Sequence, residues 1–220
     1  MISLKMREYK DTIKESSNDN HDEKSFAMKY FLSNLVFMLR NLLVSFFSKR
    51  NSDAIRWSKK GSLSPEWDSR TIQMANLVPP GTTVLEFGAG RMILAKHLPP
   101  GCMYKPSDIV DRGSGTFICD LNDPVLPTFP DHQVAFFSGV LEYVQDIPRL
   151  IDHLSSSTKV FVLSYSCNEE HSNKITRRAS GWINDLDSQT LINIFIRNGY
   201  RLDFTGSWRS QKIFRFIKSE

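Results

Sequence analysis

The stretch Val84–Met92, which reads VLEFGAGRM, decides the fold. It places a short apolar run around Glu86 directly before Gly88 and Gly90, two glycines separated by one residue. Glycine adopts positive φ without steric cost and lets the backbone approach a ligand where a Cβ atom would clash. The stretch therefore predicts the end of a buried strand that turns tightly into a helix beside a ligand.

Two common nucleotide-binding loops do not fit this stretch. The dinucleotide fingerprint requires a third glycine at position 93, which is Ile93, and the phosphate-binding P-loop requires a Gly-Lys-Ser/Thr sequence that does not follow. The pattern that fits is an acid, then two glycines at alternate positions, at the end of the first strand. The ligand is thus not identified by this stretch alone.

Short apolar runs alternate with amphipathic segments along the rest of the chain. We expect strands at 83–87, 103–109, 116–119, 133–138, 159–164, 200–205 and 212–217, and helices at about 64–78, 90–97, 147–154 and 186–198. This alternation predicts a Rossmann-like, doubly wound α/β fold with a seven-stranded, mostly parallel sheet. The last two strands are joined only by GSWRSQ, so they must form an antiparallel C-terminal hairpin.

Further motifs occur in a consistent order after VLEFGAG. The segment YKPSDIV places Asp108 at the end of the second strand, and FICDLND places Asp120 after the third. The fourth strand and its loop read VAFFSGVLEYVQDIPRLI, and the junction before the sixth strand reads RNGYRLDF. Over about residues 65–217 this ordered set resembles the class I S-adenosylmethionine-dependent methyltransferases.

The resemblance implies that S-adenosyl-L-methionine is the cofactor and that the activity is methyl transfer. The expected cofactor-binding residues are Arg70, Glu86, Gly88, Gly90, Asp108, Ile109, Asp120, Leu121, Ser138 and Val140. At the nucleoside end, Asp108 would accept hydrogen bonds from both ribose hydroxyls and Ile109 would pack on the adenine. Asp120 would accept from the adenine amino group, with the amide of Leu121 at the ring edge.

At the methionine end, the resemblance assigns the remaining positions. Glu86 would organise the loop and meet the ammonium group, directly or through water. Gly88 and Gly90 would lie against the methionine and ribose portions, and the segment 138–140 would pass the sulfonium. Arg70, one helix before the glycines, is the weaker candidate for the carboxylate.

Structural roles remain open for several of these residues. Asp120 begins a sequence with good turn chemistry, Asp108 could cap its strand, and Glu86 could brace its loop without touching the cofactor. Met92 stands where relatives often have a third glycine, which makes the cofactor affinity less certain. Tyr143 replaces the histidine that relatives often have after the fourth strand, so no histidine base is inferred there.

Methyl transfer from a sulfonium mainly requires alignment and desolvation of the nucleophile. A general base is needed only when the acceptor must lose a proton, and the weak candidates are Glu142, Tyr143 and His171. The polar segment 164–182 is expected to cover the acceptor site. Within it, Arg177 and Arg178 either bind an anionic acceptor or form a solvated pair.

The acceptor is expected to be a small molecule, a lipid or a glycan. Residues 1–60 hold twelve basic and seven acidic residues, so the other 160 residues sum to about −1, which is not typical of a nucleic-acid-binding domain. Two alternatives to an active methyltransferase are a cofactor-binding scaffold without turnover and a nucleotide-dependent oxidoreductase. The oxidoreductase is less favoured because the third glycine and a Tyr-x-x-x-Lys pair are both missing.

The chain divides into a polar, flexible tail at 1–24, an amphipathic helix and basic linker at 25–60, and a methyltransferase domain at 61–220. The helix around 26–47 carries an apolar face that could pack on the body, on a second subunit or on a membrane surface. Its Lys29 and Arg40 disfavour a membrane span. Three widely spaced cysteines form neither a zinc-ligand pattern nor a disulfide framework. We therefore expect a cytoplasmic protein, with peripheral membrane contact or dimerisation through the helix.

Overall fold

The structure is a computed structural model that describes residues 52–113 and 115–219. The predicted tail at 1–24 and the predicted amphipathic helix around 26–47 lie outside the described residues. The described part contains the whole region in which the seven strands are expected.

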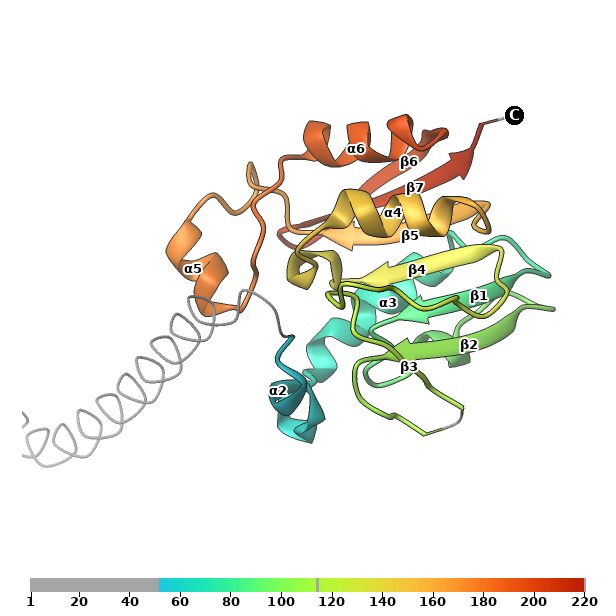
Figure 1. The fold of residues 1–220 in the computed structure, drawn as a ribbon, viewed down its shortest axis with the longest axis horizontal. Coiled ribbons are helices and arrows are strands. Elements are labelled where there is room, and N and C mark those ends of the chain that lie inside the picture. Colours follow the sequence, from blue (N-terminus) through green and yellow to red (C-terminus); the bar gives the residue numbers. More distant parts are fainter. Residues whose placement is uncertain (1–51, 114, 220) are drawn as a thin grey trace, which may run out of the picture.

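A single seven-stranded sheet forms the centre of the molecule (Figure 1). Its strands are β1 (Thr83–Phe87), β2 (Met103–Asp108), β3 (Phe117–Ile118), β4 (Val134–Ser138), β5 (Val160–Tyr165), β6 (Tyr200–Trp208) and β7 (Gln211–Lys218). The order across the sheet is β3-β2-β1-β4-β5-β7-β6, with β1 to β5 parallel and β7 antiparallel to both of its neighbours. The predicted sheet and its antiparallel C-terminal hairpin are confirmed.

Four of the five α-helices in the described residues begin at a capping side chain, and α3 is the exception. The α-helices are α2 (Ala54–Ser58), α3 (Asp68–Ala75), α4 (Ile147–Ser155), α5 (Lys174–Ala179) and α6 (Ser188–Arg197), and the 3-10 turns are η1 (Lys60–Ser62), η2 (Pro65–Trp67), η3 (Leu94–Lys96) and η4 (Leu141–Tyr143). The side chain of Asp146 accepts from the amide of Arg149 at the start of α4, and Asp187 accepts from Thr190 at the start of α6. These contacts satisfy amides that have no partner within the helix.

The prediction of a helix at 90–97 is wrong. Only the short turn η3 forms there, because Gly88, Gly90 and Met92 all adopt positive φ, at 66°, 51° and 56°. A right-handed helix cannot run through such residues. The chain therefore leaves β1 as a tight loop, which keeps backbone amides at the strand end.

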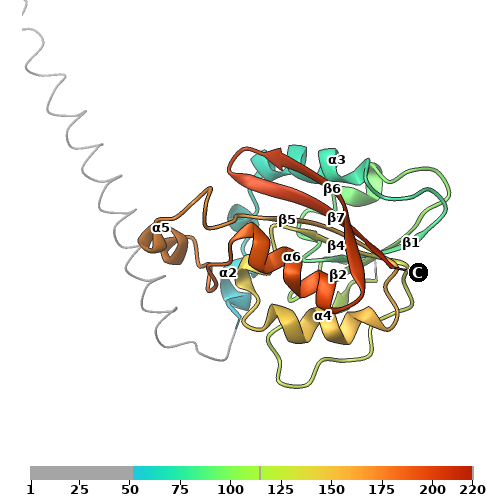
Figure 2. The ribbon, with the colours of Figure 1, turned by 90° about the horizontal axis from the view of Figure 1, so that it is seen from above.

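Side chains alternate between the two faces of the sheet, as they must in a strand. Leu85 and Phe87 point to the face covered by α4 and α6, where the larger core cluster lies, whereas Val84 points to the face covered by α3 (Figure 2). Phe137 of β4 stacks on Phe87 with ring centroids 4.6 Å apart. Helices cover both faces of the sheet, so a ligand can reach it at the carboxyl ends of the strands.

Two short helices lie beyond the carboxyl ends of the strands. Figure 1 shows α2 and α5 on the side toward which β1 and β4 point. The Nη1 atom of Arg56 in α2 donates to the carbonyl of Ser180, just after α5, at 2.9 Å. Segments separated by more than 120 residues are thus joined above the strand ends. Within the described ranges, no helix has both the length and the apolar character needed to cross a membrane.

The left-handed conformation of Met92 leads to a stability prediction. A residue with a Cβ atom loses about 1–2 kcal/mol in this conformation, whereas glycine does not. We expect Met92→Gly to be more stable to urea unfolding than Met92→Ala by about 1 kcal/mol.

The control is Met103, the exposed first residue of β2, where the backbone is extended. There glycine should be less stable than alanine by about 0.5–1 kcal/mol. The same order of stability at both positions would contradict the assigned conformation of the loop.

Candidate functional site

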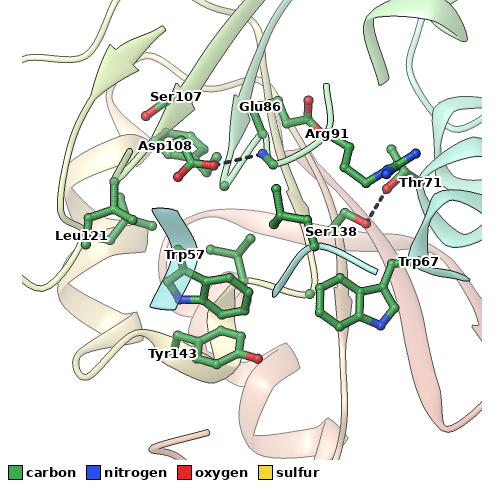
Figure 3. A pocket seen from close by; sticks show the side chains of 18 of the residues that line it. Trp57, Trp67, Thr71, Glu86, Arg91, Ser107, Asp108, Leu121, Ser138 and Tyr143 are labelled. Carbon is green, nitrogen blue, oxygen red and sulfur yellow. Dashed lines mark hydrogen bonds between the residues drawn. The ribbon is translucent and has the colours of Figure 1, made fainter. Parts of the chain in front are cut away.

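A cavity of about 210 Å³ opens at the carboxyl ends of β1, β2 and β4 (Figure 3). All ten residues predicted to bind the cofactor line it: Arg70, Glu86, Gly88, Gly90, Asp108, Ile109, Asp120, Leu121, Ser138 and Val140. In the sequence they are spread over 71 positions, from 70 to 140. The structure therefore brings the whole predicted set to one place, while the role of each residue stays a prediction.

The loop after β1 needs glycine at its first position. A Cβ atom on Gly88 would lie 2.6 Å from Cγ2 of Val140, closer than packed atoms approach, and the φ angle there is already 66°. The loop then turns so that the amide of Gly90 donates to Oδ2 of Asp108 at 2.9 Å. The glycine loop and the end of β2 thus form one unit.

Asp108 is almost completely buried at the end of β2. Its carboxylate also accepts from the amide of Val110 at 3.1 Å and pairs with the guanidinium of Arg112, whose Nη2 lies 3.1 Å from Oδ1. Arg112 in turn donates from Nη1 to the carbonyl of Trp57 at 3.0 Å. A ribose bound at Asp108 would have to share this carboxylate with Arg112.

Glu86 is buried at the end of β1 on the same cavity, and its Oε2 accepts from the hydroxyl of Tyr104 at 2.5 Å. Burial of the carboxyl group raises its pKa, the hydrogen bond from Tyr104 lowers it, the nearby charge of Asp108 raises it, and the net result is a pKa of about 8. Glu86 is therefore largely protonated near neutral pH when no positively charged ligand is bound beside it.

Asp120 follows β3 and lines the cavity. Its Oδ1 accepts from the hydroxyl of Ser52 at 2.6 Å and from the amide of Asn122 at 2.9 Å. The side chain of Asn122 donates to the carbonyl of Tyr143 at 2.8 Å, which links this turn to η4. Asp120 has both a turn-forming role and a place on the cavity wall, so the two interpretations of its sequence are compatible.

Arg70 reaches the cavity from α3 and is buried. Its guanidinium donates from Nε to the hydroxyl of Ser138 at 2.9 Å and from Nη1 to Oε1 of Gln211 at 2.8 Å. A Cβ atom on Gly139 would lie within 2.7 Å of this guanidinium, so glycine is required there for the arginine to enter. Burial lowers the pKa of Arg70, and the nearby Glu142 opposes this effect. The result is a fixed cation at the end of β4.

The three weak catalytic candidates occupy different environments. Tyr143 lines the cavity, whereas Glu142 and His171 do not. Burial raises the pKa of Tyr143 and that of Glu142. The Oε2 atom of Glu142 is buried with no hydrogen-bond partner among the described residues, while its Oε1 accepts from the amide of Ser166 at 2.8 Å. None of these placements tests a catalytic role.

The arginine pair considered for an anionic acceptor is engaged within the protein. Arg177 has no exposed surface and donates to Asp185 at 2.8 Å and to the carbonyl of Ser166 at 2.7 Å. Arg178 pairs with the same carboxylate at 2.6 Å. Their charges therefore hold the segment 166–187 in place.

Several residues on the cavity were not anticipated from the sequence. They are Ser52, Trp57, Trp67, Arg112 and Trp182. Each is a single residue outside any recognisable motif, and the only shared signal is that three of the chain's four tryptophans are among them. Within the described ranges, no three His, Cys, Asp or Glu side chains cluster as metal ligands would.

Solved structures with a similar fold are known. No protein-family model matches the sequence, and no curated protein matches it. Among solved structures, a protein of Nostoc punctiforme described as a putative O-methyltransferase superposes on this chain with a TM-score of 0.61. The two sequences are 11% identical, and the match covers 84% of this chain and 69% of the other. The 1,6-didemethyltoxoflavin-N1-methyltransferase of Burkholderia thailandensis, with its substrate and S-adenosylhomocysteine bound, superposes with a TM-score of 0.52 at 14% identity, covering 74% and 81%.

CalO1, a methyltransferase of calicheamicin biosynthesis solved with S-adenosylhomocysteine, superposes with a TM-score of 0.51 at 15% identity. The match covers 69% of this chain but only 54% of CalO1, so the chain spans about half the length of that protein. At such identities the likeness concerns the fold. The chain has the fold of the class I S-adenosylmethionine-dependent methyltransferases.

Proposed function

We propose that this chain transfers a methyl group from S-adenosylmethionine to a small-molecule acceptor. The observation that carries the proposal is the convergence of all ten predicted cofactor positions on one cavity at the strand ends. Doubly wound sheets bind their ligands outside the carboxyl ends of the strands, which is where this cavity lies. The small molecule bound to the toxoflavin enzyme, 1,6-didemethyltoxoflavin, and the place of CalO1 in calicheamicin biosynthesis support a small-molecule acceptor here.

The donor set fits the charge pattern of the cofactor. At one end, Asp108 and Asp120 supply carboxylate oxygens that can accept from ribose hydroxyls and an adenine amino group. At the other end, Arg70 supplies a buried cation suited to a carboxylate, and Glu86 supplies an acid suited to an ammonium group. Gly88 leaves no side chain between them, so an extended ligand can span the two ends.

When bound, S-adenosylmethionine supplies an activated methyl group on its sulfonium. The protein's part is then to hold the ligand's two ends, exclude water and align the acceptor. Arg70 is fixed by Ser138 and Gln211, and Asp108 by the glycine loop, so these contacts are organised before binding. Preorganised groups of this kind lose little free energy to rearrangement when the ligand arrives.

The first test is binding of S-adenosylhomocysteine, measured by titration calorimetry on the full chain. We expect saturable binding by the wild type and at least a tenfold weaker affinity for Asp108→Asn, because hydrogen bonds to a charged group contribute roughly 1.5–3 kcal/mol. The matched control is Asp152→Asn, which alters an exposed aspartate on α4 and should leave the affinity unchanged.

An absence of binding by the wild type would refute the proposal. Full affinity in Asp108→Asn would show that the cofactor does not use the assigned carboxylate. Binding without methyl transfer to any acceptor would favour the scaffold, and binding of a nicotinamide cofactor instead would favour the oxidoreductase.

The raised pKa of Glu86 gives the binding a characteristic pH dependence. Below about pH 8 the carboxyl group is protonated and cannot attract an ammonium group; as the pH rises through about 8 the carboxylate forms. Between pH 6.5 and 8.5 the affinity for S-adenosylhomocysteine should rise by about ten- to thirtyfold, and this rise should disappear in Glu86→Gln.

Stability should change in the opposite direction. The unfolded chain ionises Glu86 near its ordinary pKa of 4.5 while the folded protein keeps the proton up to about 8. The contribution of Glu86 to the free energy of unfolding is thus fully present below pH 4.5 and is lost as the pH rises through 8.

A wild-type affinity for S-adenosylhomocysteine that stays flat between pH 6.5 and 8.5 would show that Glu86 does not meet the ammonium group.

A further inference from the structure

The side of the cavity that faces away from the strand ends is aromatic. Trp57 from α2, Trp67 from η2, Tyr143 from η4 and Trp182 from the segment after α5 all line it, and we call these four residues the aromatic wall. In Figure 3, Trp57, Trp67 and Tyr143 lie across the cavity from Glu86 and Asp108. Three parts of the sequence, around residues 57–67, 143 and 182, thus contribute rings to one surface.

The rings of the aromatic wall hold one another in place. The Trp57 and Tyr143 ring centroids are 5.2 Å apart with the planes at 86°, and those of Trp57 and Trp67 are 6.5 Å apart at 62°. The indole N–H of Trp182 donates to the Tyr143 hydroxyl at 3.2 Å. Edge-to-face contacts of this type are the favoured arrangement of aromatic pairs. The wall is therefore formed before an acceptor arrives.

Two guanidinium groups pack on the rings of the aromatic wall. The guanidinium of Arg56 lies 4.7 Å from the centroid of Trp57, and that of Arg177 lies 5.0 Å from the centroid of Trp182. Cations over ring faces stabilise the rings' positions. Since Arg56 also donates to the carbonyl of Ser180, the two halves of the wall are joined.

The carboxylates of the cavity are engaged by neighbouring groups, whereas the aromatic wall presents rings. Its four carboxylates belong to Asp68, Glu86, Asp108 and Asp120, and each is bonded to a neighbour: Arg91, Tyr104, Gly90 and Ser52 are among the partners. The side chains of the aromatic wall instead present ring surface together with indole N–H and phenol groups.

This division distinguishes between kinds of acceptor. A sugar carries many hydroxyl protons, and the nearest carboxylate and amide oxygens, on Asp68 and Asn122, already accept from Arg91 and from the amide of Gln145. Burying a sugar against the indole rings would therefore cost hydrogen bonds to water. An alkyl chain would be tolerated, but it gains nothing from ring orientation. A flat aromatic ring gains both burial and favourable ring geometry.

We propose that the methyl acceptor is a planar aromatic molecule seated on the aromatic wall; this inference rests on the proposed function. In the reaction, a lone pair on a ring nitrogen or on an ionised oxygen of the acceptor forms the new bond to the methyl carbon. The carbon–sulfur bond breaks, its electron pair returns to sulfur, and the products are the methylated acceptor and S-adenosylhomocysteine. Any proton left on a methylated nitrogen passes to water.

The experiment measures binding of three probes to the full chain saturated with S-adenosylhomocysteine. The probes are acridine-9-carboxylate, methyl α-glucoside and decyl phosphate below its micelle concentration, and they represent planar aromatic, glycan and lipid acceptors. We expect saturable binding of the acridine probe with quenching of tryptophan fluorescence, and at least tenfold weaker binding of the other two.

The variants are Trp182→Ala and Trp57→Leu, which remove rings from two separate elements of the wall. Each should weaken acridine binding at least tenfold while changing the S-adenosylhomocysteine affinity less than threefold. The control is Trp208→Phe, which alters the one tryptophan outside the cavity and keeps an aromatic ring beside Arg70. Two variants are used because Trp182 also packs on Arg177, and its loss could disorder the segment 166–187.

Preferential binding of the glucoside or of decyl phosphate would overturn the inference and leave the proposed function intact. Equal loss of acridine and S-adenosylhomocysteine binding in both wall variants would assign the wall to the cofactor. Unchanged acridine binding in both variants would show that the wall does not hold the acceptor. An absence of S-adenosylhomocysteine binding by the wild type would refute the proposed function itself.

Discussion

The hydrogen bond from the Gly90 amide to the Asp108 carboxylate is the contact on which the site depends. It fixes the loop after β1 against the end of β2, and it forms only because Gly88 and Gly90 adopt positive φ. Through Arg112 the same carboxylate also reaches the carbonyl of Trp57, so α2 is positioned from the sheet. One buried aspartate therefore connects the strand ends with the segment that covers them.

Buried polar groups at the end of β4 form a second connected set. Arg70 donates to Gln211, whose amide nitrogen lies 3.3 Å from Oε1 of Glu142, and the same oxygen accepts from the amide of Ser166. A buried cation is costly unless its hydrogen bonds are satisfied. Arg70 meets this condition through Ser138 and Gln211, and burial raises the pKa of the neighbouring Glu142. Arg70 also lines the cavity, where an anionic ligand group would be a further partner of its guanidinium.

The sequence was informative where one local rule determines the structure. Short apolar runs predicted all seven strands, and the glycines of VLEFGAGRM predicted the tight turn after β1. The helix expected at 90–97 failed because the positive φ of Met92 cannot be read from a methionine. The helices α2 and α5 were missed because each has only five or six residues and is held by long-range contacts such as Arg56 to Ser180.

The same distinction applies to the two sides of the cavity. The side formed by the strand ends carries acids and glycines whose spacing reflects the sheet, so the positions of Glu86, Gly88 and Asp108 could be anticipated. Trp57 and Trp182 come together only after separate connecting segments have folded over the strand ends, and no spacing in the sequence encodes their contact with Tyr143. Most groups proposed for the cofactor therefore lie at strand ends or directly after them, with Arg70 on α3 as the exception, whereas those proposed for the acceptor lie in the connections. If the proposed roles hold, changes confined to the connecting segments would alter the acceptor and leave the groups at the strand ends in place.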